Sequence, residues 1–366
     1  MDIVLTQDQE VALKRMKSWY YGNISQVFTL AGCAGSGKST LISYLCKELN
    51  IDDSFIIYCS LTGKAAQVLS KKGVSACTIH HLIYDVDLTS KKLKFTKKDH
   101  LDYPYKLIIV DEFSMVDRKI HQDLLSFGVK TIVVGDPFQL PPIGEDVGLL
   151  SNPDALLLQV VRQEQDSPII RLATHIRNGG NLVEGTIGDS VVITTKDIPD
   201  RVYFKADQVL VGLNSTRKEL NEHMRSLKGF HDKLPQVGDK LLCIRNNWDC
   251  YIDGIPLING AIGYVKMFRP RSDGSGLLQF RPDYTTDSKI LNIDLSPFLG
   301  KKPTDKLLLD LFDFGYVITV HKSQGSEYNN VLLVDDWPKS KDYNRWLYTA
   351  VTRAKKKLII KKRSWR

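Results

Sequence analysis

The chain has 366 residues, of which 43% are hydrophobic and 25% are charged, and its net charge is +8. This length is enough for two to three domains with sizeable cores. No apolar run approaches the roughly 20 residues of a membrane-spanning helix, and no basic segment precedes an apolar one at the N-terminus, so we expect neither a membrane segment nor a secretory signal. Six cysteines without a C-x-x-C pair favour reduced thiols in a cytoplasmic protein over a disulfide scaffold or a zinc site.

The first predicted elements are an apolar strand at 27–30, a glycine-rich loop and a helix at 40–46. The loop has the G-x-x-x-x-G-K-S/T pattern of P-loop NTPases, here Gly32-Cys33-Ala34-Gly35-Ser36-Gly37-Lys38-Ser39. Its glycines allow backbone N–H groups to point at phosphate oxygens, and the N-terminus of the following helix, near Thr40, adds partial positive charge. Lys38 can then reach the β- and γ-phosphates of ATP, and Ser39 can bind Mg²⁺.

Three further apolar strands are predicted in the first 150 residues, at 55–59, 107–110 and 131–134, and helices follow most of the strands. This alternation predicts an α/β fold with a mostly parallel sheet that is covered on both faces. Ligands of such sheets bind beyond the carboxyl ends of the strands. We therefore expect the polar residues that follow the strands to share one site with the glycine-rich loop.

Two acids and a glutamine follow these strands. Asp111 and Glu112 come directly after the strand at 107–110. An aspartate there can hold Mg²⁺ through water, and a glutamate can orient or deprotonate an attacking water. Gln139 lies in a proline-rich loop after the strand at 131–134 and can sense a γ-phosphate. Taken alone, each of these stretches is equally typical of a surface loop.

The strand pattern resumes in the second half of the chain, with strands at 208–212, 316–320, 331–334 and 358–360 and a polar helix at 216–227. Between them, residues 238–308 are rich in Gly, Pro, Asp and Asn with short alternating strands, which predicts a small all-β insert. Seven positive charges fall in the last twelve residues, and five lysines cluster at 91–98. Such clusters suit nucleic acid, although each is also compatible with a solvated surface or a frayed tail.

The motifs together resemble those of superfamily 1 helicases of the RecD/Dda branch. Asp111-Glu112-Phe113-Ser114-Met115 looks like motif II and Gly135-Asp136-Pro137-Phe138-Gln139-Leu140-Pro141-Pro142 like motif III. Motifs V and VI are present as Thr319-Val320-His321-Lys322-Ser323-Gln324-Gly325-Ser326-Glu327 and Tyr348-Thr349-Ala350-Val351-Thr352-Arg353-Ala354. The motifs occur in the family's order and span nearly the whole chain.

This resemblance implies an α/β protein with two RecA-like P-loop NTPase domains that contain parallel sheets. The first would span 1–154, with a small β-hairpin insert at about 84–104. The second would combine 155–237 with 309–366, and 238–308 would form an SH3-like all-β insert.

The resemblance also assigns residues to the nucleotide. Gln9 matches a glutamine that reads adenine, and Glu327 matches an acid near the nucleotide sugar. Arg162 and Arg353 match arginine fingers of the second domain, which stabilise transition-state charge only when the cleft closes. The predicted catalytic residues are Lys38, Asp111, Glu112, Gln139, Arg162 and Arg353. The predicted nucleotide-binding residues are Gln9, Gly32, Gly35, Ser36, Gly37, Lys38, Ser39, Thr40 and Glu327, and Mg²⁺ would be held by Ser39 and Asp111.

A channel for single-stranded DNA follows from the same resemblance. Its predicted contacts are Thr62, Lys64, Thr78, His80, His321, Lys322 and Ser323. Hydroxyls and lysines suit tracking of the sugar–phosphate backbone without sequence readout, although His80 is also compatible with a structural histidine. Phe95 lies where Dda-type enzymes carry a hairpin with an aromatic wedge, so we predict that it stacks at the fork. A hydrophobic anchor for the hairpin is the alternative role.

The function that the resemblance implies is an ATP-dependent DNA helicase that moves 5′→3′ on single-stranded DNA, unwinds duplexes, uses ATP and Mg²⁺ and acts as a monomer. We expect single-stranded and forked DNA as partners, with a single-stranded-DNA-binding protein or replisome component as a further candidate, in a bacterial or phage-infected cell. Three alternatives stay open from the sequence. They are a translocase that remodels protein–DNA complexes without unwinding, a nucleic-acid-binding module without turnover, and an enzyme that acts on RNA.

Overall fold

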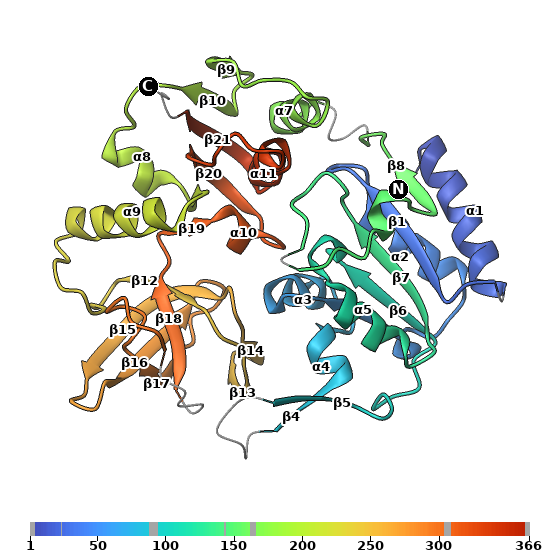
Figure 1. Cartoon of the computed structure of the whole chain (residues 1–366), viewed down its shortest axis with the longest axis horizontal. Coiled ribbons are helices and arrows are strands. Elements are labelled where there is room, and N and C mark those ends of the chain that lie inside the picture. Colours follow the sequence, from blue (N-terminus) through green and yellow to red (C-terminus); the bar gives the residue numbers. More distant parts are fainter. Residues whose placement is uncertain are drawn as a thin grey trace.

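The computed structural model describes residues 4–22, 24–87, 94–142, 144–161, 166–303 and 309–362. Two six-stranded sheets, each with its own helices, form a first and a second α/β core, and a closed five-stranded barrel lies beside the second core (Figure 1). The chain builds the first core, enters the second, leaves it to form the barrel and returns to complete the second core (Figure 1). Within the described residues, no helix is long and apolar enough to cross a membrane.

Six parallel strands form the sheet of the first core. In sheet order they are β3 (Ala76–Thr78), β2 (Ile56–Ser60), β6 (Leu107–Asp111), β7 (Lys130–Gly135), β1 (Val27–Gly32) and β8 (Ala155–Leu157). Successive side chains of β6 point to opposite faces: Leu107 and Ile109 pack with the helices α1 and α2, whereas Ile108 and Val110 pack with α4 and α5. Because both faces are buried, the strands are continuous apolar runs in the sequence.

The helices of the first core are α1 (Gln7–Tyr21), α2 (Lys38–Glu48), α3 (Gly63–Lys71), α4 (Ile79–Ile83) and α5 (Arg118–Leu125), with short 3₁₀ turns at Asp53–Phe55, Phe113–Met115 and Leu149–Ser151. Four of these α-helices begin at a residue whose side-chain oxygen accepts a backbone N–H of the first turn: Thr6, Thr62, Thr78 and Asp117. Only α2, which follows the glycine-rich loop, lacks such a cap.

The second core has the same architecture. Its strands in sheet order are β19 (Val317–Thr319), β11 (Gln208–Val211), β20 (Tyr328–Asp335), β21 (Ala354–Lys362), β10 (Val191–Thr194) and β9 (Gly185–Ile187), all parallel except for the β9–β10 pair. Its helices are α7 (Pro168–Arg177), α8 (Asp200–Lys205), α9 (Asn214–Leu227), α10 (Val320–Ser323) and α11 (Tyr343–Val351). One face packs with α7 and α11 and the other with α8 and α9. The basic C-terminal segment forms β21 as far as Lys362, so the frayed-tail alternative is wrong for these residues.

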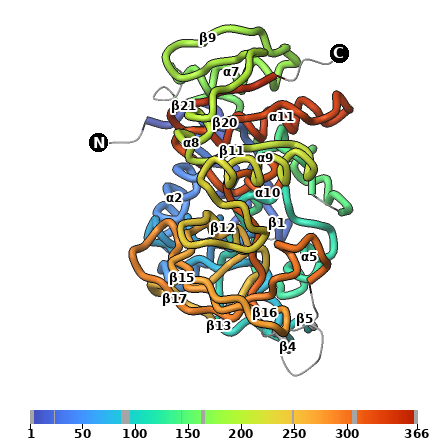
Figure 2. The backbone as a smooth tube through the Cα atoms, turned by 90° about the vertical axis from the view of Figure 1, so that its left-hand side faces the viewer, coloured from blue at the N-terminus to red at the C-terminus, as the bar shows by residue number. Residues whose placement is uncertain are grey.

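The barrel contains β12 (Lys240–Cys243), β15 (Ile262–Pro270), β16 (Ser275–Pro282), β17 (Lys289–Asp294) and β18 (Asp310–Phe314), and it closes through the β12–β18 pair. Two hairpins extend from the body: β4 (Tyr84–Asp87) with β5 (Lys94–Lys97) from the first core, and β13 (Asn247–Ile252) with β14 (Ile255–Leu257) from the barrel segment. Both hairpins lie at the same end of the molecule in the two views (Figures 1 and 2).

Two expected domain boundaries are displaced in the structure. β8 was expected in the second domain, but it pairs with β1 and completes the first sheet. β18 was also expected there, but it closes the barrel by pairing with β12 and β17. Both strands are short, so their assignment depends on which neighbour they pair with rather than on their own sequence pattern.

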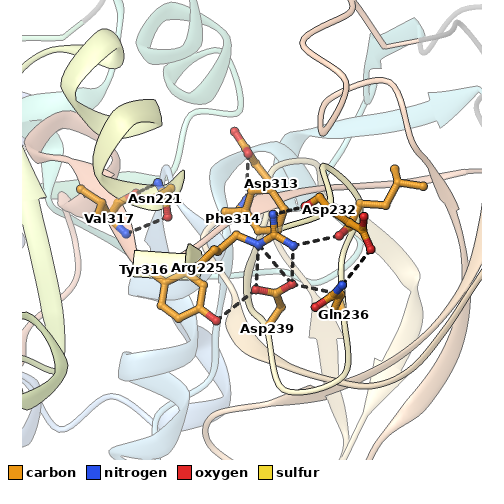
Figure 3. A network of polar contacts seen from close by, with 10 residues as sticks. Asn221, Arg225, Asp232, Gln236, Asp239, Asp313, Phe314, Tyr316 and Val317 are labelled. Atoms are coloured by element: carbon orange, nitrogen blue, oxygen red, sulfur yellow. Dashed lines mark hydrogen bonds and ion pairs between the residues drawn. The ribbon is translucent and has the colours of Figure 1, made fainter. Parts of the chain in front are cut away.

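A buried ion pair joins the barrel to the second core (Figure 3). Arg225 of α9 is 4% exposed, and its guanidinium donates to the carboxylate of Asp239, which is fully buried, at 3.0–3.3 Å. The same carboxylate accepts the hydroxyl of Tyr316 at 3.0 Å and the backbone N–H of Gln236 at 2.8 Å. The Arg225 guanidinium also lies 4.0 Å from the ring centre of Phe314 in β18. These contacts hold α9, the start of the barrel and its last strand together.

Replacing Asp239 with alanine should cost about 3–5 kcal/mol of local stability, because Arg225 would remain as a buried charge without its partner. Amide hydrogen exchange in β12 and β18 should accelerate accordingly. Lys17→Ala is the matched control, because it breaks an exposed ion pair: the side chains of Lys17 and Glu48 are 38% and 40% exposed. This variant should leave hydrogen exchange in the barrel unchanged. Equal exchange in the Asp239→Ala variant and the parent protein would contradict the assigned role of this pair.

Candidate functional site

Residues 33–37 connect β1 to α2 as the glycine-rich loop. The N-cap of α2 is Gly37, so the first N–H groups of this helix have no side-chain acceptor and stay free for an anionic ligand. At Gly37, φ is +75° and an added Cβ would lie 2.5 Å from Nε2 of Gln9. Glycine is therefore required here for both its backbone conformation and its lack of a side chain.

Lys38 and Gln9 are held by backbone carbonyls of this loop. Nζ of Lys38 donates to the carbonyl oxygens of Gly32 at 2.8 Å and Cys33 at 2.9 Å. Gln9 is buried in the capping box of α1, where its Oε1 accepts the backbone N–H of Thr6 and its Nε2 donates to the carbonyl of Ser36, both at 2.9 Å. Each of these bonds uses half of the amide's capacity, so the second N–H of Nε2 and the second lone pair of Oε1 stay available to a nucleotide base.

Asp111 and Glu112 lie at the carboxyl end of β6. One oxygen of Asp111 accepts the backbone N–H of Glu112 at 2.9 Å, and Glu112 itself has a left-handed backbone with φ of +53°. Burial raises the pKa of both carboxyls, and Lys38 partly offsets the shift for each. For Glu112 the largest opposing effect on the pKa comes from Arg353 of the second core. The two cores are thus coupled electrostatically through this acid.

The second core contributes Arg353 and Glu327. Arg353 is 3% exposed and donates to the carbonyls of Thr349 at 3.0 Å and Ser326 at 3.2 Å. Glu327 is exposed and forms an ion pair with Lys355 at 2.7 Å. Arg162, the other predicted arginine finger, lies outside the described residues.

A cavity of about 820 Å³ separates the two cores and collects most of the predicted nucleotide-site residues. Those on its wall are Gly35, Ser36, Gly37, Lys38, Ser39, Thr40, Asp111, Glu112, Gln139, Glu327 and Arg353. Gln9 and Gly32 are buried behind the glycine-rich loop. The amide oxygen of Gln139 is buried without a hydrogen-bond partner in the described part of the chain, so it is available to a ligand.

Sequence reasoning missed the residues that join the two cores beside this cavity. The hydroxyl of Tyr348 in α11 accepts the backbone N–H of Ala34 and donates to the carboxylate of Asp136, both at 2.8 Å. The neighbouring Thr349 accepts the backbone N–H of Leu140 at 2.9 Å. The one available signal was the position of Tyr348 in motif VI, five residues before Arg353.

The first-core residues predicted to bind DNA divide into surface and structural positions. Thr62 caps α3, and Lys64 lies 4.8 Å from the ring centre of Tyr328 while it also lines the nucleotide cavity. Thr78 is 1% exposed and its hydroxyl accepts the backbone N–H of His81 at 3.2 Å. Its side chain is therefore used inside the fold, which contradicts a direct contact with DNA.

His80 and Phe95 form part of one aromatic group at the base of the β4–β5 hairpin. The His80 ring centre lies 5.6 Å from those of both Tyr84 and Phe95. Burial lowers the pKa of His80, so its imidazole is neutral near pH 7. Phe95 is 47% exposed, so one side of its ring packs on this group and the other faces solvent.

The second-core candidates also differ in accessibility. His321 packs against Trp337, with ring centres 5.3 Å apart, and burial lowers its pKa. Lys322 is exposed and its Nζ donates to Asn259 of the barrel segment at 3.4 Å. Ser323 is fully buried and donates to the carbonyl of Val320 at 2.7 Å, so its predicted contact with DNA is corrected to a structural role.

The donor set in the cavity fits Mg²⁺ held together with a nucleotide. Asp111 offers a carboxylate and Ser39 an exposed hydroxyl, and both are the hard oxygen ligands that this ion prefers. In the described part of the chain, no group of three or more His, Cys, Asp and Glu side chains is arranged to hold a metal ion. A site with one or two protein carboxylates agrees with the way Mg²⁺ is bound alongside phosphates.

Comparison with known families agrees with these features. Residues 4–190 match the family model of an AAA domain, and residues 314–360 match that of a UvrD-like helicase C-terminal domain. The ATP-dependent RecD2 DNA helicase of Deinococcus radiodurans is 28% identical over 90% of this chain, and the ATP-dependent DNA helicase Dda of Enterobacteria phage T4 is 31% identical over 45% of it. The chain belongs to the Pif1/RecD/Dda-like helicases of superfamily 1.

The chain spans 46% of the length of the RecD2 relative and 43% of that of Dda. The match to the ATP-dependent DNA helicase Pif1 of Campylobacter jejuni is more extensive: it is 25% identical over 89% of this chain and 86% of its own length. The solved structure of Bacteroides Pif1 bound to single-stranded DNA shares the fold, with a TM-score of 0.60 and 17% identity over 98% of this chain and 92% of that one. This Pif1/RecD/Dda-like chain therefore has the fold of the group across nearly its full length.

Glu112→Gln should stabilise the ligand-free protein increasingly as the pH rises above about 4.5. The reason is linkage: burial raises the pKa of Glu112, so the folded state binds its proton more tightly than the unfolded chain does and loses stability on ionisation. Thermal unfolding at pH 4.5 and pH 8 measures the effect. Glu145→Gln, at an exposed site of the same core, is the control and should show no such trend. If the melting temperatures of Glu112→Gln and the parent protein differ by the same amount at both pH values, this linkage is refuted.

Proposed function

We propose that the chain is an ATP-dependent DNA helicase that moves 5′→3′ along single-stranded DNA and unwinds duplex DNA. The observation that carries this proposal is that Lys38 and Glu112 of the first core and Arg353 of the second core line one cavity. A nucleotide bound there touches both cores, so its hydrolysis changes the interactions that hold the cores together. Two grips on DNA, one on each core, then alternate with the nucleotide state.

Each residue of the cavity has a distinct role in this proposal. Lys38 and Arg353 offset the negative charge of the transferred phosphoryl group. Glu112 accepts the proton of the attacking water, and its burial, which raises its pKa, makes it a stronger base than an exposed carboxylate. Ser39 and Asp111 would hold Mg²⁺, which would neutralise negative charge of the nucleotide when it is bound. Gln139 senses the γ-phosphate through its unpartnered amide oxygen, and Arg162 stays a predicted second arginine finger.

For DNA we propose a track that runs over both cores beneath the barrel. Lys64 and the cap of α3 at Thr62 lie on the first core, and His321 and Lys322 lie on the second. The barrel borders this track, because Asn259 accepts from Lys322 and an added Cβ at Gly260 would lie 3.8 Å from Cβ of Lys64. We assign the barrel as the SH3-like insert of the RecD/Dda branch. Lysine and backbone contacts of this kind bind phosphates without reading sequence.

The relatives support the substrate and the direction. The RecD2 and Dda relatives are named ATP-dependent DNA helicases, and the similar Bacteroides Pif1 structure holds single-stranded DNA. Movement in the 5′→3′ direction follows from the resemblance of the motifs to the RecD/Dda branch. Single-stranded and forked DNA are therefore the partners we propose, with monomeric action. A single-stranded-DNA-binding protein as a further partner stays a prediction.

The decisive experiment compares unwinding of duplexes with a 5′ or a 3′ single-stranded tail in the presence of ATP and Mg²⁺. We expect unwinding from the 5′ tail only, and its complete loss in Lys38→Ala, because Lys38 is the cation of the glycine-rich loop. Lys14→Ala, on the opposite side of α1 from Gln9, is a charge-matched control that should unwind normally.

Other outcomes separate the alternatives. Unwinding from the 3′ tail alone would keep the helicase and refute the proposed direction. DNA-stimulated ATP hydrolysis without unwinding would favour a translocase that remodels protein–DNA complexes. Equal activity on RNA and DNA tails would refute a DNA-specific enzyme.

The exposed side of Phe95 leads to a separate expectation for strand separation. Removing an aromatic platform costs roughly 1–3 kcal/mol per stacked base, so Phe95→Ala should slow unwinding about tenfold or more. Hydrolysis of ATP stimulated by single-stranded DNA should stay within about twofold, because Phe95 is outside the nucleotide cavity. Phe95→Tyr keeps the ring and should unwind normally. Parallel loss of unwinding and ATP hydrolysis in Phe95→Ala would show that this residue anchors the hairpin instead.

A further inference from the structure

Two thiols face each other across the edge of the first sheet. Cys59 of β2 and Cys77 of β3 are directly paired in the parallel ladder, and their Sγ atoms are 4.0 Å apart. Neighbouring strands are about 4.8 Å apart, which lies inside the range of Cα separations of roughly 4.4–6.8 Å that a disulfide bridges. The two side chains therefore need only local movement to bond.

The position of β3 permits that movement. β3 has three residues, lies at the edge of the sheet and pairs only with β2 within it. Cys59 is fully buried, whereas Cys77 is partly exposed, so an oxidant in solution reaches Cys77 first. Other described cysteines lack this arrangement: Cys243 and Cys250 are both buried in the barrel segment, and no contact joins their Sγ atoms.

We propose that Cys59 and Cys77 are a reversible oxidation site that forms a disulfide by exchange with a small disulfide such as glutathione disulfide. The Cys77 thiolate attacks one sulfur of the small disulfide and releases one small thiol. Sγ of Cys59 then attacks Sγ of Cys77 in the mixed disulfide, which forms the Cys59–Cys77 bond, breaks the bond to the small molecule and releases the second small thiol. The two protein thiols are oxidised, the small disulfide is reduced, and the two protein protons end on the two released thiols.

The bond would form directly ahead of two helix caps. Thr78, which caps α4, follows Cys77, and Thr62, which caps α3, lies three residues after Cys59. Pulling β3 towards β2 moves both strand ends, and with them Lys64 on α3 and His80 on α4. The functional part of this inference rests on the proposed function, because it treats Lys64 and the α3 cap at Thr62 as part of the DNA track. Oxidation should therefore weaken the grip on single-stranded DNA while leaving the nucleotide loop between β1 and α2 in place.

The test equilibrates the full chain with glutathione disulfide and measures its intact mass, its disulfide-linked peptides and its affinity for single-stranded DNA. We expect the mass to fall by two hydrogen atoms and the peptides of Cys59 and Cys77 to be cross-linked. The affinity for single-stranded DNA should fall by roughly five- to tenfold, which is the effect expected when one helix cap and its phosphate contact are displaced. Reduction with dithiothreitol should restore the original mass and the original affinity for DNA. Cys77→Ala should abolish the change, whereas Cys250→Ala, the matched buried thiol of the barrel segment, should retain it.

Three results would overturn the inference: six thiols that stay alkylatable, a cross-link between other cysteines, or a 59–77 disulfide that leaves affinity for DNA unchanged. The reduced protein tests the proposed function separately. If it does not bind single-stranded DNA, the proposed function fails, and the mass and peptide results still decide whether the oxidation site exists.

Discussion

The hydroxyl of Tyr348 is the contact on which the arrangement of the two cores depends. It accepts an N–H of the glycine-rich loop and donates to Asp136, so three segments from two cores meet at one oxygen. The other oxygen of Asp136 accepts the backbone N–H of Phe138 at 3.0 Å. Because a buried polar group without a partner costs about 1–3 kcal/mol, these groups are stable only together. Arg353 lies in the turn directly after the helix of Tyr348 and is hydrogen-bonded to the carbonyl of Thr349 within it, so its approach to Glu112 depends on this contact.

Lys38 and Arg353 are held by neutral groups rather than by Asp111 and Glu112, the two buried acids of the cavity. Lys38 donates to two backbone carbonyls of its own loop, and Arg353 donates to the carbonyls of Thr349 and Ser326. Across the described residues, no ion pair joins either cation to Asp111 or Glu112. A buried ion pair would have to be broken before a phosphate could bind, at a cost of several kcal/mol. Carbonyl partners are weaker, so they hold each cation in position and can be exchanged for phosphate oxygens.

The sequence predicts the elements of this molecule best where a motif with a known chemical role lies beside a clear strand or helix pattern. The strand expected at 27–30 is β1, and the helix expected at 40–46 lies within α2, because an apolar run, a glycine loop and an amphipathic helix each have a local signature. Strands β3, β8, β9 and β10 were missed because three or four residues show little period; the equally short β19 was found because it lies within a longer apolar run at 316–320. Thr78 and Ser323 matched motifs by residue type, but whether a hydroxyl faces solvent or caps a helix is decided by packing. The Tyr348 bridge joins residues 314 positions apart, which a single sequence does not reveal.

Helix α3 lies between the nucleotide cavity and the barrel. Some of its residues line the cavity, and others contact the barrel segment. Lys64, Val68 and Lys72 at and after its first turn line the cavity. On the barrel side, an added Cβ at Gly63 would lie 2.4 Å from Ile258, and the Nζ atom of Lys71 lies 4.8 Å from the ring centre of Tyr284. Both contacts are with residues of the barrel segment.

The second core approaches the same end of α3. A Cβ added at Gly325 would lie 3.1 Å from both Ala65 and the hydroxyl of Thr62. Close packing of this kind transmits displacement, because interiors have too little free volume to absorb it. Since the Arg225–Asp239 pair fixes the barrel to the second core, the barrel and the loop at Gly325 contact α3 as one unit. Helix α3 is therefore the element of the first core that contacts the nucleotide cavity, the barrel segment and the second core at once.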